Sequence, residues 1–244
     1  MKREILIPAL VLTVMVLSFF GFILIRSYSS RLPEVPTIIT VTTTTIIPST
    51  TTVSTIPESF SINVPYSVQA PEANWAIHEE SCEEAAALMY HYFLKKTSFP
   101  NDIIPPAQAS SEIIAMKNWQ VNRYGKEPDL KITELGEFVK EYYGYNYEHS
   151  SKTTKEDIMG TISTGKPIIV PVITHALQNP NYGPNPSYHV LLIKGYNQNG
   201  VITNDAGIKE GKDYFYSWET LFSAIDAQTI KMNQGREMIT LTLT

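Results

Sequence analysis

Apolar residues recur at helical spacing in the stretch 74–96. One stripe of this predicted helix contains five apolar residues, namely Ala85, Leu88, Met89, Tyr92 and Phe93. Ser81 followed by Glu84 has the S-x-x-E form of a capping box, which places Cys82 at the first helical position. The pattern therefore predicts an amphipathic helix that begins at the chain's single cysteine.

The hydrophobic period changes from helical to extended further along the chain. Amphipathic helical patterns cover three segments: 111–124, 133–143 and 154–165. Strand patterns then cover 167–173, 188–196 and 201–205, with a turn of the Asn-Gly type joining the last two. A short strand near 62–66 and an edge strand from Arg236 complete the set. Together these elements predict an α+β domain.

The first 25 residues carry the longest apolar run in the sequence. Residues 5–25 contain no charge and are long enough to cross a hydrocarbon core of about 30 Å as a helix. A cleaved signal peptide is the alternative, but its apolar region is usually about 7–15 residues. We expect a short cytoplasmic N-terminus at 1–4 and a transmembrane anchor at 5–25.

The segment that follows the predicted anchor is rich in Thr, Ser and Pro. Residues 26–57 include the run TVTTTTIIPSTTTVST, a composition typical of exposed stalks, although its β-branched residues leave a strand open as the alternative. A stalk after an anchor predicts a single-pass protein of the cell membrane with its C-terminal domain, 58–244, outside the cytoplasm. The membrane is then one partner.

Composition narrows the classes of partner. The 244 residues carry a formal net charge of −5, and no basic cluster interrupts the acidic background, which argues against nucleic acid. One cysteine allows no internal disulfide, and an odd cysteine in an extracellular setting is a candidate reactive thiol. A lone cysteine is otherwise most often a small buried apolar residue.

Three residues have the order of a thiol hydrolase site. Cys82 lies at a helix start, where unpaired N–H groups and the helix dipole favour a thiolate. His189 opens one strand of the predicted hairpin and Asp205 closes the next, so both should meet at one end of the sheet. Opposing this, four glutamates crowd the thiol and would raise its pKa: Glu79, Glu80, Glu83 and Glu84.

Other candidates carry weaker signals. Gln69 precedes the cysteine and could donate to an oxyanion, although an exposed glutamine is common. His175 is a rival for the general base. The histidines lack i, i+4 spacing and one cysteine makes no Cys-x-x-Cys pair, so a metal site is disfavoured. The aromatic group at 214–218, which includes Tyr214, Phe215, Tyr216 and Trp218, is assigned to the core.

The stretches VPYSVQAPEANWAIHEESCEEAAALM and YHVLLIKGYNQNGVITNDAG resemble the peptidase family related to the double-glycine leader (bacteriocin-processing) peptidases, a branch of the papain-like cysteine peptidases. The likeness covers about residues 60–243. It implies a papain-like fold, with a nucleophile helix and further helices packed on an antiparallel sheet. It also implies Cys82 as the nucleophile, His189 as the base, Asp205 as the orienting acid and Gln69 as the oxyanion donor.

The chain departs from this family at several positions. Glu83 and Glu84 follow the cysteine where many members have Gly-Pro, which weakens the assignment of Gln69, and Ala206 replaces the usual proline after the acid. No ATP-binding motif accompanies the domain, so processing coupled to export does not follow.

The sequence as a whole predicts a membrane-anchored thiol hydrolase that cleaves peptide or isopeptide bonds and requires no cofactor. A peptide or protein is the expected substrate. Two alternatives remain: an inactive peptidase-like module that binds peptide or a cell-envelope polymer, and a thiol acyltransferase.

Overall fold

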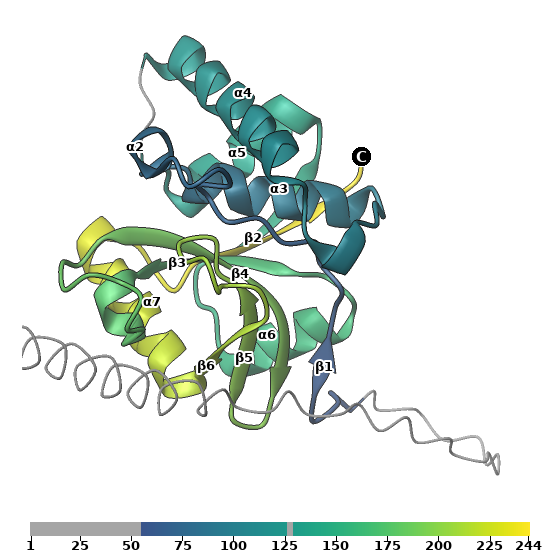
Figure 1. Ribbon diagram of the computed structural model, residues 1–244. Helices are drawn as coiled ribbons and strands as arrows, with labels where there is room; N and C mark the ends of the chain where they lie inside the picture. Colours follow the sequence, from purple (N-terminus) through teal and green to yellow (C-terminus); the bar gives the residue numbers. More distant parts are fainter. Residues whose placement is uncertain (1–54, 126–128) are drawn as a thin grey trace, which may run out of the picture. The chain divides into compact units, whose positions relative to one another are not determined.

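The computed structural model describes residues 55–125 and 129–244, and Figure 1 shows their arrangement. The predicted anchor at 5–25 and nearly all of the predicted stalk lie outside these residues. Among the residues described, no helix is both long and apolar enough to span a bilayer.

The first half of the described chain is helical, as the periodicity predicts. Its principal helices are α3 (Cys82–Leu94), α4 (Pro106–Tyr124) and α5 (Ile132–Tyr143), preceded by the short α2 (Trp75–His78) and with the 3-10 turn η1 (Pro100–Asp102) between α3 and α4. In Figure 1 these helices occupy the upper part of the view, above the sheet.

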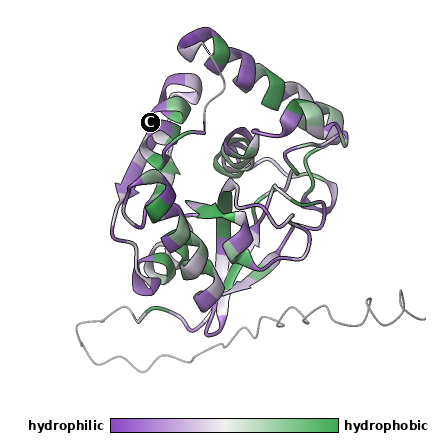
Figure 2. Ribbon diagram, turned by 90° about the vertical axis from the view of Figure 1, so that its left-hand side faces the viewer, coloured by the Kyte–Doolittle hydropathy of each residue, from purple (hydrophilic) through white to green (hydrophobic). Residues whose placement is uncertain are grey.

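Helix α3 forms the centre of the domain. Its residues from Cys82 to Tyr90 are all buried, because α4 packs on one side of it and the sheet on another. Figure 2 shows α3 almost end-on, surrounded by other elements. The predicted single apolar stripe is therefore an incomplete description, since the polar positions Glu83 and Glu84 are buried as well.

Among the described residues, the second half of the chain supplies all but one strand of an antiparallel sheet. Its strands are β1 (Phe60–Ser61), β2 (Asn146–Ser150), β3 (Ile168–Ile173), β4 (Tyr188–Asn197), β5 (Gly200–Asn204), β6 (Tyr214–Ser217) and β7 (Met238–Thr242). The main order is β2-β7-β3-β4-β5-β6, and β1 pairs with the end of β4. Helices α6 (Lys155–Ser163) and α7 (Trp218–Met232) pack against these strands, and the 3-10 turn η2 (Thr174–Leu177) follows β3.

Three local expectations are wrong. The C-terminal strand β7 is not at an edge, because it lies between β2 and β3. The predicted strand near 62–66 is not regular, because β1 ends at Ser61 and Tyr66 makes only an isolated bridge with Ile103. The capping box does not form, since Ser81 makes no side-chain cap hydrogen bond. Lys155 does begin α6 behind a complete Thr154–Asp157 capping box.

The β4–β5 hairpin sets the geometry of the site. The two strands pair from Asn197 opposite Gly200 back to Leu192 opposite Asn204, with one irregularity between Ile193 and Gly195. On its other side, β4 pairs with β3, where His189 lies opposite Val172. The start of β4 and the end of β5 therefore lie at the same end of the sheet.

Candidate active site

His189 and Asp205 form a buried ion-pair geometry at this end of the sheet. The Nε2 atom of His189 lies 2.9 Å from Oδ1 of Asp205. His189 is 3% exposed and Asp205 is fully buried. An ionised carboxylate only accepts hydrogen bonds, so Nε2 carries a hydrogen and Nδ1 remains as the second functional atom of the ring. The hairpin thus brings together the two residues that the sequence placed at its ends.

The carboxylate of Asp205 is held by several donors. The hydroxyl groups of Tyr182 and Tyr216 each donate to it at 2.6 Å, and the main-chain N–H of Gly207 donates at 3.0 Å. Burial would raise the pKa of Asp205, but the charge of His189 and these hydrogen bonds outweigh burial and hold its pKa below the ordinary value. Asp205 is therefore ionised and can orient the imidazole.

Tyr182 and Tyr216 are site residues that the sequence interpretation missed. Tyr182 comes from the loop before β4, and its ring centroid lies 5.6 Å from that of His189. Tyr216 lies on β6 and is buried, as its assignment to the core predicts, yet its hydroxyl binds Asp205. Burial raises the pKa of both hydroxyls, which remain hydrogen-bond donors. No local pattern marks either residue, because both contacts depend on the tertiary fold.

Gly207 is required by the close approach of these side chains. A Cβ atom at this position would lie 2.3 Å from the Tyr182 hydroxyl oxygen and 2.9 Å from Cε1 of His189. A side chain there would displace one or both residues. The glycine after Ala206 therefore allows the loop to pass directly over the His189–Asp205 pair.

Cys82 is the first residue of α3, as predicted, and is 5% exposed. Its thiol donates to Oε2 of Glu83 at 2.9 Å. Burial raises the pKa of the thiol well above its ordinary value, and the charges of Glu83 and Glu84 raise it further. The main-chain N–H of Val190, the residue after His189, lowers the pKa of the thiol, but by less than burial and the glutamates raise it. Helix α3, which begins at Cys82, packs against β4. The resting cysteine is thus a thiol near the start of β4.

Gln69 lies next to this group but is engaged elsewhere. Its main-chain N–H donates to the carbonyl of Ala206 at 2.8 Å, which ties it to the Asp205 loop. Its side-chain Nε2 donates to the carbonyls of His78 at 2.9 Å and Glu79 at 3.0 Å. Both amide hydrogens are therefore used, and an oxyanion role would require at least one to be released. That role stays a prediction.

His175, the other candidate for the general base, lies apart from the His189–Asp205 pair. His175 is exposed in η2, whereas His189 is buried against Asp205. His78 is buried near the start of α3, with Nδ1 3.3 Å from the Ser81 hydroxyl, and burial lowers its pKa. Within the described ranges, no group of three or more His, Cys, Asp or Glu side chains could hold a metal ion.

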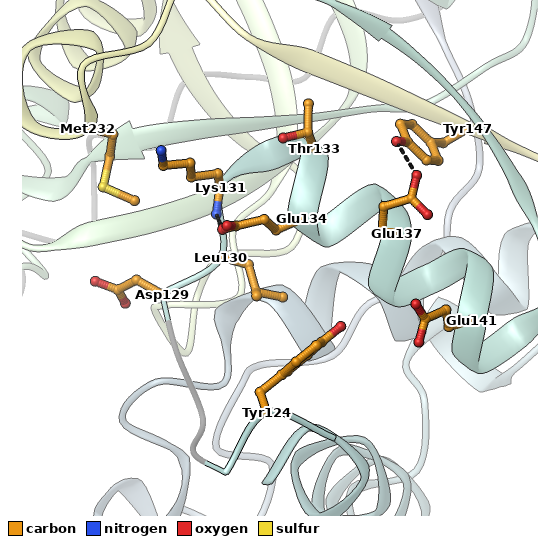
Figure 3. A pocket seen from close by; sticks show the side chains of 10 residues that line it. All are labelled: Tyr124, Asp129, Leu130, Lys131, Thr133, Glu134, Glu137, Glu141, Tyr147 and Met232. Carbon is orange, nitrogen blue, oxygen red and sulfur yellow. Dashed lines mark hydrogen bonds between the residues drawn. The ribbon is translucent and has the colours of Figure 1, made fainter. Parts of the chain in front are cut away.

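A separate cavity of about 660 Å³ opens beside α5. Figure 3 shows its acidic lining, which includes Asp129, Glu134, Glu137 and Glu141. Its wall also contains Leu130, whose main-chain N–H donates to Oε1 of Glu83 at 2.9 Å. The cavity is therefore linked to the nucleophile's neighbour by one hydrogen bond, although none of the predicted catalytic residues lines it.

Comparison with known proteins relates this geometry to a family. The family model described as "Peptidase_C39 like family" matches residues 61–227, more than half of the chain. A structure of a Bacillus anthracis protein described as C39-like aligns with a TM-score of 0.51 and 13% identity, covering 77% of this chain and 99% of that chain. Xylellain, a cysteine protease from Xylella fastidiosa, aligns with a TM-score of 0.42 and 11% identity, covering 86% of this chain and 95% of that chain. No curated protein matches.

Proposed function

The chain belongs to the C39-like peptidase family, and from this premise we propose that it is a cysteine hydrolase that cleaves peptide or isopeptide bonds with Cys82, His189 and Asp205. The observation that carries the proposal is the buried His189–Asp205 pair at the start of β4, against which the helix that begins at Cys82 packs. A carboxylate that orients an imidazole next to a thiol is the arrangement that nucleophilic catalysis requires.

The proposed reaction has two stages. Cys82 transfers its proton to Nδ1 of His189 while the sulfur bonds to the substrate carbonyl carbon. The resulting oxyanion collapses, the C–N bond breaks, and His189 returns the proton to the leaving amine. Water then attacks the thioester with His189 again accepting a proton, which releases the carboxylic acid and restores the thiol. Asp205 stabilises the imidazolium in both stages, and the Cys82 N–H and Gln69 are the proposed oxyanion donors.

The test is direct cleavage by the full-length chain. A mixed peptide pool is incubated with the protein in H₂¹⁸O and analysed by mass spectrometry, with Cys82→Ala as the matched variant. We expect new C-termini that carry ¹⁸O, and we expect Cys82→Ala to abolish them. Products that instead carry an added amine would make the protein an acyltransferase. An absence of products from a folded chain would overturn the proposed hydrolysis.

A binding module is the second candidate function. It is favoured by the thiol of Cys82, whose pKa is raised by burial and by two glutamates and whose hydrogen is donated to a carboxylate. Such a module would retain peptides from the same pool without altering their mass. It would also retain them equally well as the Cys82→Ala variant, whereas an enzyme would release shortened products.

We further propose that the domain is displayed outside the cytoplasm by the apolar run at 5–25 and the Thr-rich segment at 26–57. The sequence supports this placement through the uncharged length of the run and the composition that follows it. A C-terminal epitope tag is then expected to be removed when intact cells are treated with protease. Deletion of residues 5–25 should release the chain from membranes under alkaline extraction. A tag that resists protease until the cells are lysed would contradict the topology.

A further inference from the structure

Glu83 is the direct hydrogen-bond partner of the candidate nucleophile. Its Oε2 atom accepts the Cys82 S–H at 2.9 Å. The side chain is 2% exposed, which is unusual for a glutamate and requires that its oxygens be satisfied. In the sequence, Glu83 is one of four glutamates near the thiol and, with Glu84, stands where many members of the similar family have Gly-Pro.

The other carboxylate oxygen is fixed by a distant segment. Oε1 of Glu83 accepts the main-chain N–H of Leu130 at 2.9 Å, and the carbonyl of Leu130 accepts the Tyr188 hydroxyl at 2.5 Å. Tyr188 precedes His189 in β4. Leu130 is therefore held between Glu83 and the strand that carries the base, so the carboxylate is fixed in place by the fold.

A carboxylate in this position favours the protonated form of the sulfur. It accepts a hydrogen that only the thiol possesses, and its charge repels a thiolate. The titratable groups around it include Cys82 and Glu84 on its own helix, Asp129 beside Leu130, and Tyr188 on β4. These four groups are neutral or negative, and His189, the base of the same site, has its Nε2 bound to Asp205.

We propose that Glu83 is a positioning residue that holds the proton of Cys82 in the resting site and must release that hydrogen bond before the proton moves to His189. The proposal rests on the proposed function. The Cys82–Glu83 hydrogen bond then keeps the sulfur protonated in the resting site. Substrate breaks this hydrogen bond by drawing the sulfur toward the scissile carbonyl. The proton itself still passes from sulfur to Nδ1 of His189, and Glu83 gains and loses none in the reaction.

The experiment measures thiol alkylation, which requires no substrate. Because the chain has one cysteine, iodoacetamide incorporation reports Cys82 alone. The alkylation rate is followed from pH 5 to pH 10 in full-length wild type, Glu83→Gln and Glu84→Gln. The Glu83→Gln side chain keeps an oxygen for the Leu130 N–H but loses the charge. Glu84 is the matched control, because it is the next residue, is equally buried and binds Gln120 instead of the sulfur.

We expect Glu83→Gln to shift the alkylation midpoint to lower pH and to accelerate alkylation at pH 8. Each pKa unit lost by the thiol raises the thiolate fraction tenfold but lowers its nucleophilicity, for a net gain of about three- to fourfold. The gain should narrow below about pH 7, because burial raises the pKa of Glu83 to about 7 and the wild-type carboxylate becomes protonated there. Glu84→Gln should shift the midpoint less.

Two results would overturn the proposal. If Glu83→Gln has the wild-type profile, or shifts no more than Glu84→Gln, the contact does not restrain the thiol. If Glu83→Gln reacts more slowly, Glu83 activates the thiol instead. Thermal unfolding of each variant identifies a change in alkylation that is caused by misfolding. In that case Glu83→Asp, which keeps the charge but has a shorter side chain, is compared with wild type instead. Failure of peptide cleavage with a shifted alkylation profile would contradict the proposed function alone.

Discussion

Asp205→Ala is expected to lower the free energy of unfolding by about 3–5 kcal/mol, because it removes one partner from a fully buried ion pair. The change leaves His189 Nε2 and the hydroxyl groups of Tyr182 and Tyr216 without their shared acceptor. Each unsatisfied buried polar group adds a desolvation cost. Urea unfolding near pH 7 measures the loss.

The pH dependence of stability provides a second measure of Asp205. Its pKa is lower in the folded protein than in the unfolded chain, so its ionisation stabilises the fold above the unfolded value of about 3.9. That contribution is lost as the pH falls through the lower, folded pKa. Asp205→Asn keeps the shape without the charge. We expect its stability to fall less than that of wild type over this acid range.

Asp226 is the matched control for both measurements. It also forms an ion pair, with Arg236, but its side chain is 47% exposed. Exposed pairs contribute about 0–1 kcal/mol, so Asp226→Ala should have a small effect. If Asp205→Ala costs no more than Asp226→Ala, the Asp205 network does not stabilise the domain, and the orientation of His189 must depend on other contacts.

The meeting of His189 and Asp205 could be predicted because it depends on a local hairpin. The predicted turn at 197–200 and the apolar segments on either side of it fix which residues end opposite each other, and β4 and β5 pair accordingly. The start of α3 at Cys82 was also predicted correctly, although the capping box on which that prediction rested does not form. The hairpin is encoded by neighbours in the chain.

The rest of the site depends on residues far apart in the sequence. The predicted Ser81–Glu84 capping box does not form, and Oε1 of Glu84 instead accepts a hydrogen bond from Gln120 of α4. Leu130 binds Glu83 across 47 positions, and Tyr182 reaches Asp205 across 23. The hydrophobic periodicity of a segment gives no information on contacts with distant segments. For the same reason the interior position of β7 could not be predicted, because it depends on the order of strands and not on the pattern within one.

His189→Ala is expected to slow peptide hydrolysis by about 10²–10⁴-fold, the usual contribution of a general base. The same change should have little effect on alkylation of the resting thiol, because that thiol donates to Glu83. The rate of peptide hydrolysis therefore measures the contribution of His189, and the alkylation rate of the resting thiol measures the contribution of Glu83. The double variant Cys82→Ala with His189→Ala should be no slower than Cys82→Ala, since residues that act as a unit are not additive.

His175→Ala is the control, because it removes the rival base from an exposed position in η2. Its rate of hydrolysis should equal that of wild type. If His175→Ala hydrolyses peptides much more slowly than wild type and His189→Ala hydrolyses them at the wild-type rate, the general base does not lie in the β4–β5 hairpin. Asp205 would then have only a structural role. A large loss at His189 alone would assign proton transfer to the imidazole whose Nε2 binds Asp205, because that ring, unlike the exposed His175, is buried and oriented by a carboxylate at the start of β4, against which α3 packs.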